Sequence, residues 1–208
     1  MRDSEDALLI VDVQNDFCPG GALAVADGHL IIPKINAISP SFRTAIVTKD
    51  WHPAGHISFA SSHPTNHVYD RIVVGGKTQV LWPEHCIQGS SGSELRTDLN
   101  IEPIHLILHK GYRLGLDSYS AFFENDGFTQ TGLVHFLRGL GVTTVFLAGL
   151  ATDYCVYYTA MDALRTGFKV VLVTDAMEGV DQPEGSINHS LKTMEEQGAK
   201  LIESTEII

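Results

Sequence analysis

Residues 7–13 read ALLIVDV, a run that is apolar at every position except Asp12. A strand with one face in water alternates apolar and polar residues, whereas a continuous apolar run indicates a strand covered on both faces. Shorter or weaker apolar runs recur at residues 45–48, 104–108, 145–148, 170–173 and 199–202. The sequence therefore predicts about six strands, most of them buried.

Helical patterns lie between and after these runs, at residues 30–38, 132–138, 154–166 and 184–197. Glycine follows the ends of the last three, where a left-handed residue commonly stops a helix. Strands that alternate with helices at this spacing indicate a three-layer α/β/α fold with a mainly parallel, about six-stranded sheet. The length of 208 residues fits a single domain over residues 1–208.

The segment 50–102 differs from the rest of the chain because it is rich in Gly, Pro, Ser and His and poor in periodic apolar stretches. A long irregular insertion in a compact domain is usually functional or disordered. The aromatic residues Trp51, Phe59 and Trp82 and five histidines argue against disorder. We therefore expect an ordered loop insertion that builds a functional site.

The composition disfavours several classes of partner. With 14 Lys and Arg against 25 Asp and Glu, the net charge is −11, which argues against nucleic acid and against an anionic membrane surface. Three cysteines leave at least one thiol unpaired, which favours a reducing compartment. We recognise no signal peptide, transit peptide or membrane-spanning run. These features predict a cytoplasmic protein, with a homo-oligomer left open.

Three residues with useful chemistry follow the ends of different apolar runs: Asp12, Lys110 and Cys155. The carboxyl ends of parallel strands meet at one edge of a sheet, where such folds bind ligands. The alternatives are that Asp12 caps a turn, Lys110 reaches past its strand into solvent, and Cys155 is a buried structural thiol. A cysteine in the first turn of a helix favours the thiolate, and Thr152 or Asp153 could cap that helix.

Asp50 and His52 stand two residues apart after the second apolar run, so an extended chain projects both side chains to the same side. Oxygen and imidazole ligands together suit zinc, iron or manganese. Four more histidines downstream could complete the set. The alternative is that these histidines are exposed in a loop and bind nothing.

Five short motifs occur in order over most of the chain. They are DVQNDFC at residues 12–18, DWHP at 50–53, WPEHC at 82–86, KGYRLGLDSYSAF at 110–122 and GLATDYCV at 149–156. Together they resemble the isochorismatase-like cysteine hydrolases and, among these, the nicotinamidases, which are also called pyrazinamidases. The resemblance extends from about residue 8 to residue 179.

This resemblance implies a catalytic triad of Asp12, Lys110 and Cys155. It also implies a non-proline cis peptide bond between Leu150 and Ala151, and an oxyanion hole formed by the backbone N–H groups of Ala151 and Cys155. The chain would then be a metal-containing amidohydrolase that converts nicotinamide to nicotinate and ammonia through a thioester on Cys155. Pyrazinamide would be a second substrate, and NAD salvage the setting.

The same resemblance implies one divalent metal ion, zinc with iron or manganese as alternatives, held by Asp50, His52 and His85. Some relatives also use a later histidine of the loop, for which His56 is the candidate, although the loop is shorter here than in those relatives. The pyridine ring of the substrate would lie among Phe17, Trp82, Tyr119 and Ala151.

Rival functions differ in chemistry. An amidohydrolase for another small amide or a carbamoyl compound would not need the three metal ligands, and an isochorismatase proper does not use the nucleophilic cysteine. A redox or metal-binding protein without turnover would use Cys18 and Cys86 as a reversible pair, but the chain has no Cys-x-x-Cys motif. An interaction module that only keeps the fold would not need the complete triad.

Overall fold

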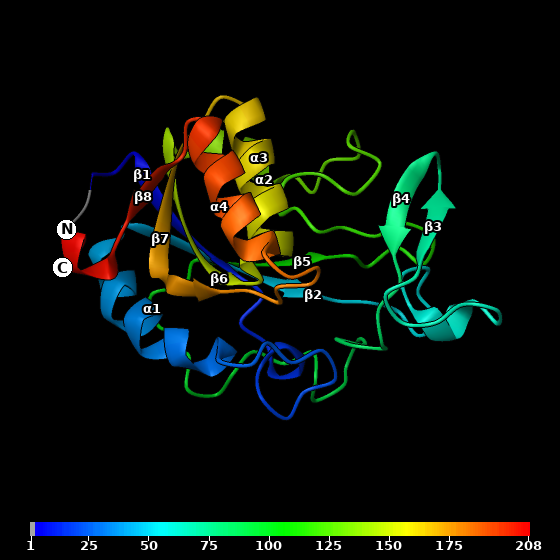
Figure 1. Ribbon diagram of the computed structural model, residues 1–208. Helices are drawn as coiled ribbons and strands as arrows, with labels where there is room; N and C mark the ends of the chain where they lie inside the picture. Colours follow the sequence, from blue (N-terminus) through cyan, green and yellow to red (C-terminus); the bar gives the residue numbers. More distant parts are fainter. Residues whose placement is uncertain (1–2) are drawn as a thin grey trace.

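The computed structural model describes residues 3–208 and contains one central six-stranded sheet (Figure 1). The strand order is β5-β2-β1-β6-β7-β8, and every neighbouring pair is parallel. The strands are β1 (Asp6–Val11), β2 (Thr44–Asp50), β5 (Leu106–Lys110), β6 (Thr144–Leu150), β7 (Lys169–Glu178) and β8 (Lys200–Ile202). All six apolar runs are therefore strands of this sheet, as predicted.

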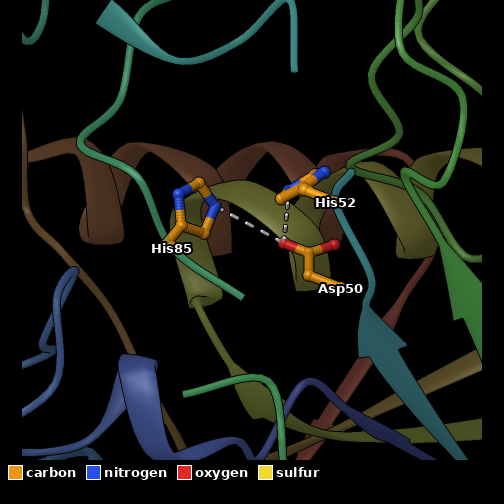
Figure 2. Close-up of side chains that lie close together, drawn as sticks. All are labelled: Asp50, His52 and His85. Atoms are coloured by element: carbon orange, nitrogen blue, oxygen red, sulfur yellow. Dashed lines mark ion pairs between the residues drawn. The ribbon is translucent and has the colours of Figure 1, made fainter. Parts of the chain in front are cut away.

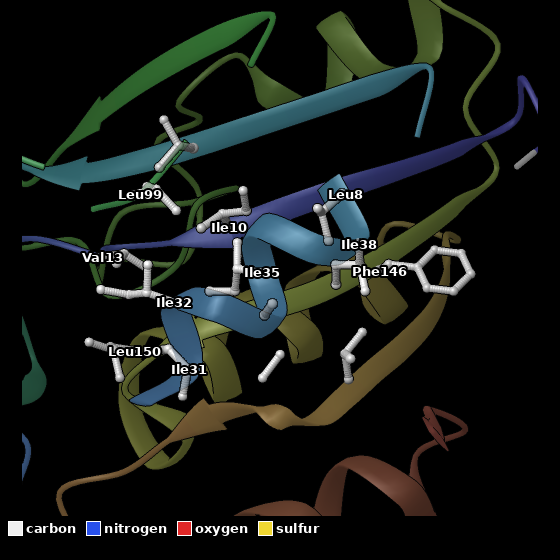
Figure 3. Close-up of a cluster of buried hydrophobic side chains, with 14 of the residues drawn as sticks. Leu8, Ile10, Val13, Ile31, Ile32, Ile35, Ile38, Leu99, Phe146 and Leu150 are labelled. Carbon is white, nitrogen blue, oxygen red and sulfur yellow. The ribbon is translucent and has the colours of Figure 1, made fainter. Parts of the chain in front are cut away.

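Helices cover both faces of the sheet and complete the three layers (Figure 1). Helix α1 (Ile32–Ile38) lies on one face, and α2 (Leu133–Gly139), α3 (Tyr157–Arg165) and α4 (Ser186–Glu196) lie on the other. Alternate residues of β1 enter two separate cores. Leu8 and Ile10 pack with α1 (Figure 3), whereas Leu9 and Val11 pack with α2 and α3. Burial on both faces explains why this strand has no polar alternation.

The inserted segment is not wholly irregular, which corrects the prediction of a loop over residues 50–102. It contains an antiparallel hairpin, β3 (Arg71–Val74) and β4 (Lys77–Val80), which stands apart from the main sheet (Figure 1). The turn between the strands is Gly75-Gly76, and both glycines have positive φ, 55° and 80°. Two glycines between short β-branched runs are a recognised hairpin signal. The runs were too short and too exposed to stand out as strands.

The direction in which the chain adds strands to the sheet reverses between β1 and β6. From β1 the chain builds β2 and β5 on one side, and then crosses over to build β6, β7 and β8 on the other. Loops leave the carboxyl ends of the strands in opposite directions at such a point, which creates a crevice for ligands. Gly149 lets the two strands approach closely, because a Cβ atom there would lie 2.1 Å from the carbonyl oxygen of Val11. The residues that follow β1 and β6 are thus brought to one place.

Over residues 3–208, none of the helices combines the length and the apolar character needed to cross a membrane.

Candidate active site

Asp12, Lys110 and Cys155 meet at the carboxyl edge of the sheet. The ammonium of Lys110 lies 2.8 Å from Oδ2 of Asp12 and 3.3 Å from Sγ of Cys155. Asp12 directly follows β1, Lys110 ends β5, and Cys155 lies in the π-helical turn Thr152–Val156 between β6 and α3. Lys110 and Asp12 are fully buried. The alternative that Lys110 reaches out into solvent is therefore wrong.

The turn that carries Cys155 is built largely from backbone. The peptide bond between Leu150 and Ala151 is cis, as the resemblance implied. The backbone N–H groups of Tyr154 and Val156 donate to the carbonyl oxygen of Ala151. No side chain caps the turn, so the expectation that Thr152 or Asp153 caps it is wrong. The carboxylate of Asp153 instead accepts from the backbone of the segment that follows β7, at Val180 (3.0 Å) and Asp181 (2.9 Å).

Burial shifts the pKa values of both Cys155 and Asp12. Burial holds the pKa of the Cys155 thiol well above its usual value, and the carboxylates of Asp12 and Asp50 act in the same direction, against Lys110. Burial also raises the pKa of Asp12 to about 6, although Lys110 opposes this. These shifts oppose the thiolate expected from the helix end and favour a neutral thiol. The carboxyl group of Asp12 is the group placed to take its proton.

Asp50, His52 and His85 form a second cluster next to the triad. Oδ2 of Asp50 lies 3.6 Å from Nε2 of His52 and 3.8 Å from Nε2 of His85 (Figure 2). All three side chains are buried, and their ligating atoms lie within 4.8 Å of one another. One carboxylate oxygen and two imidazole nitrogens converge on a small space, which is a suitable donor set for zinc, iron or manganese.

The other nitrogen of each histidine contacts a backbone carbonyl. Nδ1 of His52 lies 2.8 Å from the carbonyl oxygen of Gly111, and Nδ1 of His85 lies 2.8 Å from that of Pro83. A carbonyl only accepts, so Nδ1 carries the hydrogen, and in the neutral ring Nε2 then presents its lone pair, as ligating histidines require. Burial, reinforced by His52, lowers the pKa of His85 to about 4, which keeps that imidazole neutral. The residues present therefore fit a divalent cation.

The ammonium of Lys110 connects the two clusters. It contacts Oδ1 of Asp50 as well as Asp12 and Cys155, and it donates to the carbonyl oxygen of Ser118 at 3.0 Å. Lys110 and His52 hold the pKa of Asp50 well below its usual range, although burial alone would raise it. Asp12, Asp50 and Cys155 also lie close enough together to share a cation, but an ion among them would collide with this ammonium, which leaves the histidine-containing groups as candidates.

His56 lies beside this cluster and does not enter the set formed by Asp50, His52 and His85. Its ring stacks on that of His52 at 4.2 Å between centroids, and its ligating atoms group with those of His52 and Asp117. Nδ1 lies 2.7 Å from Oγ of Ser58, and Nε2 lies 3.3 Å from the carbonyl oxygen of Leu116. Both nitrogens therefore have protein partners, which favours a supporting role for this histidine.

A small cavity lies against both clusters. Asp50, His52 and His85 form part of its wall, and Cys155 another part. The remaining wall includes the four residues that the resemblance assigned to the substrate, namely Phe17, Trp82, Tyr119 and Ala151. A small, mostly apolar cavity with a few polar groups at defined positions is typical of a site for a small aromatic molecule.

The sequence analysis missed several residues around this cavity. Leu23, Asp117, Tyr154 and Val180 also line it, and Gln79 of the hairpin donates to Oδ2 of Asp117 at 2.9 Å. Asp117 and Tyr154 belong to the motifs at residues 110–122 and 149–156, so these motifs could have identified both as residues of the site. The others come from segments without a chemical pattern in the sequence.

Comparison with known proteins agrees with this geometry. The isochorismatase domain matches residues 6–206, nearly the whole chain, and the chain therefore belongs to the isochorismatase domain family. A nicotinamidase of Acinetobacter baylyi is 45% identical over 202 residues, which cover 97% of this chain and 94% of that protein. Within the family the chain thus groups with the nicotinamidases, which are amide hydrolases.

Solved structures agree with the sequence comparison. The structure described as Acinetobacter baumanii nicotinamidase and pyrazinamidase is 46% identical, with a TM-score of 0.98, and 100% of each chain is covered. A pyrazinamidase of Pyrococcus horikoshii, solved in complex with zinc, is 38% identical, with a TM-score of 0.77, over 96% of this chain and 99% of that one. The predicted family and fold are confirmed.

Proposed function

We propose that this enzyme hydrolyses nicotinamide to nicotinate and ammonia through a thioester on Cys155, and that it accepts pyrazinamide as well. The observation that carries the proposal is the position of the Lys110 ammonium, which joins the Asp12–Cys155 pair to Asp50 at the wall of one small cavity. The nicotinamidase and pyrazinamidase relatives support this choice of substrates.

In the proposed reaction, Asp12 takes the thiol proton as Cys155 attacks the amide carbon, and Lys110 stabilises the thiolate as it forms. The backbone N–H groups of Ala151 and Cys155 stabilise the oxyanion. Asp12 then gives its proton to the nitrogen, because an amide nitrogen leaves poorly without protonation. Water cleaves the thioester, with Asp12 again acting as the base.

We propose that one divalent metal, zinc being the first candidate, is held by Asp50, His52 and His85. The zinc complex of the Pyrococcus relative and the donor set described above support this assignment. When bound, the cation would supply a Lewis acid to which the ring nitrogen of the substrate can bind. The walls formed by Phe17 and Trp82 would then hold the ring in the cavity.

Ammonia release from nicotinamide, measured on the purified enzyme with and without prior chelation, tests the proposal. We expect ammonia and nicotinate in equal amounts. Chelation should lower kcat/KM at least about a hundredfold, because fixing a reacting group can contribute several kcal/mol, and added zinc, iron or manganese should restore it. No ammonia from nicotinamide under any metal condition would refute the proposed activity. Full activity after verified removal of the metal would limit the cation to a structural role.

Benzamide is expected to be hydrolysed at least about a hundredfold less efficiently than nicotinamide, because it has the same shape without the ring nitrogen. His52→Ala should damage nicotinamide turnover far more than benzamide turnover and so narrow this difference. The measurement is kcat/KM for both substrates on both proteins. An equal loss for the two substrates would show that His52 does not act through the ring nitrogen.

A further inference from the structure

Thr48 contacts the proposed base at two points. Its hydroxyl lies 2.6 Å from Oδ1 of Asp12, and the backbone N–H of Asp12 donates to the same hydroxyl oxygen at 3.1 Å. Thr48 lies in β2 next to the end of β1, since the neighbouring pair Ile10 and Val47 are in register. Both Thr48 and Asp12 are fully buried, so water does not compete for these contacts.

The chemistry of the groups fixes the direction of both hydrogen bonds. A backbone N–H can only donate, so the hydroxyl oxygen of Thr48 accepts from Asp12. An ionised carboxylate can only accept, so the single hydroxyl hydrogen of Thr48 is donated to Oδ1 of Asp12. Thr48 therefore has no freedom to turn its hydrogen elsewhere while Asp12 is charged.

This arrangement makes the two carboxylate oxygens unequal. Oδ1 accepts the hydrogen of Thr48, whereas Oδ2 faces the ammonium of Lys110, which also lies 3.3 Å from the thiol sulfur. A proton from Cys155 that went to Oδ1 would weaken Oδ1 as the acceptor of the buried Thr48 hydrogen bond, whereas Oδ2 accepts no hydroxyl and lies beside the ammonium that contacts the thiol. The proton is therefore directed to Oδ2.

The backbone of Asp12 needs the same support. Its φ is +49°, in the left-handed region, where residues other than glycine are uncommon. Such conformations persist where the surroundings over-determine them. The bond from the Asp12 N–H to Thr48 joins the backbone of Asp12 to the hydroxyl that fixes its carboxylate, so one residue holds both parts.

We infer that Thr48 is a positioning residue for the reaction: it fixes the carboxylate of Asp12 so that Oδ2 alone exchanges the proton with the thiol of Cys155 and with the leaving nitrogen. This inference rests on the proposed function. Thr48 touches neither substrate nor thiol in this role and acts only through Asp12.

Thr48→Val keeps the shape of the side chain and removes the hydroxyl. We expect kcat on nicotinamide to fall roughly 10- to 100-fold, the effect of losing a buried hydrogen bond to a charged group, with KM changed less than about twofold. Thr48→Ser keeps the hydroxyl and should recover kcat to within about threefold of the parent. Thr44→Val, which removes a buried hydroxyl at the other end of the same strand, is the matched control and should leave kcat unchanged.

A second comparison separates positioning from a general loss of stability. In the Asp12→Asn background, Thr48→Val should cause no further loss of kcat, because the group through which it acts is already gone. Metal content and thermal unfolding are measured on every variant, and Thr48→Ala replaces Thr48→Val if the latter does not fold. A fall in kcat that Thr48→Ser fails to rescue, or a parent-like kcat in Thr48→Val, would overturn the inference. An inactive parent enzyme would instead refute the proposed function.

Discussion

Replacing Cys155 by alanine is expected to lower kcat on nicotinamide by at least about 10⁴-fold, the scale seen when a catalytic nucleophile is removed. The thiol lies in the wall of the cavity beside Lys110 and is the group that attacks in the proposed reaction. Metal content and the thermal unfolding midpoint should stay close to those of the parent, because the sulfur is outside the Asp50, His52 and His85 set.

Cys18→Ala is the matched control for this experiment. Cys18 is also a buried free thiol, but it packs in the core on the α1 face of the sheet. Its loss should affect stability and leave kcat near that of the parent. If Cys155→Ala kept activity within tenfold of the parent, Cys155 would not be the nucleophile.

The second large effect is expected from Asp12→Asn, which should lower kcat by about 10³-fold or more, because an amide can neither accept the thiol proton nor return it to ammonia. The substitution also removes a negative charge 2.8 Å from the buried ammonium of Lys110. Steady-state kinetics, together with unfolding measurements, separate the chemical effect from the structural one.

The double variant Asp12→Asn/Cys155→Ala tests whether the two residues act as a unit. We expect it to be no slower than the worse single variant, since residues of one catalytic unit give non-additive losses. Losses that add on a logarithmic scale would mean that Asp12 and Cys155 work independently, and the triad would have to be abandoned.

Much of the fold could be predicted because burial leaves a simple mark on the sequence. β1 is covered on both faces and is therefore continuously apolar, and the same reasoning located β2, β6 and β7. The edge strands β5 and β8 are partly exposed and were located by shorter or weaker apolar runs. The ends of the strands were predicted less accurately than their existence. β7 was expected at residues 170–173 but extends to Glu178, past a register shift against β6 near Gly149, and the pattern of side chains does not reveal such an irregularity.

The site could be predicted in part for a different reason. Asp12, Lys110 and Cys155 are individually weak signals, and they became meaningful only because a parallel sheet gathers the carboxyl ends of its strands. The motifs then supplied the proposed metal ligands and four residues of the cavity wall. Thr48 and Gln79 act through hydrogen bonds between distant segments, which leave no pattern in the sequence. The cytoplasmic location and a homo-oligomer stay predictions.

The shared position of Lys110 has a thermodynamic consequence. Its ammonium touches Asp50 of one cluster and Asp12 and Cys155 of the other, all within a buried site. Any event that changes the charge at one cluster changes the free energy of events at the other, and linkage requires the effect to be equal in both directions. In the proposed enzyme, the change in cation affinity when Cys155 loses its proton and the change in the proton affinity of Cys155 when the cation binds are then two measures of one coupling energy.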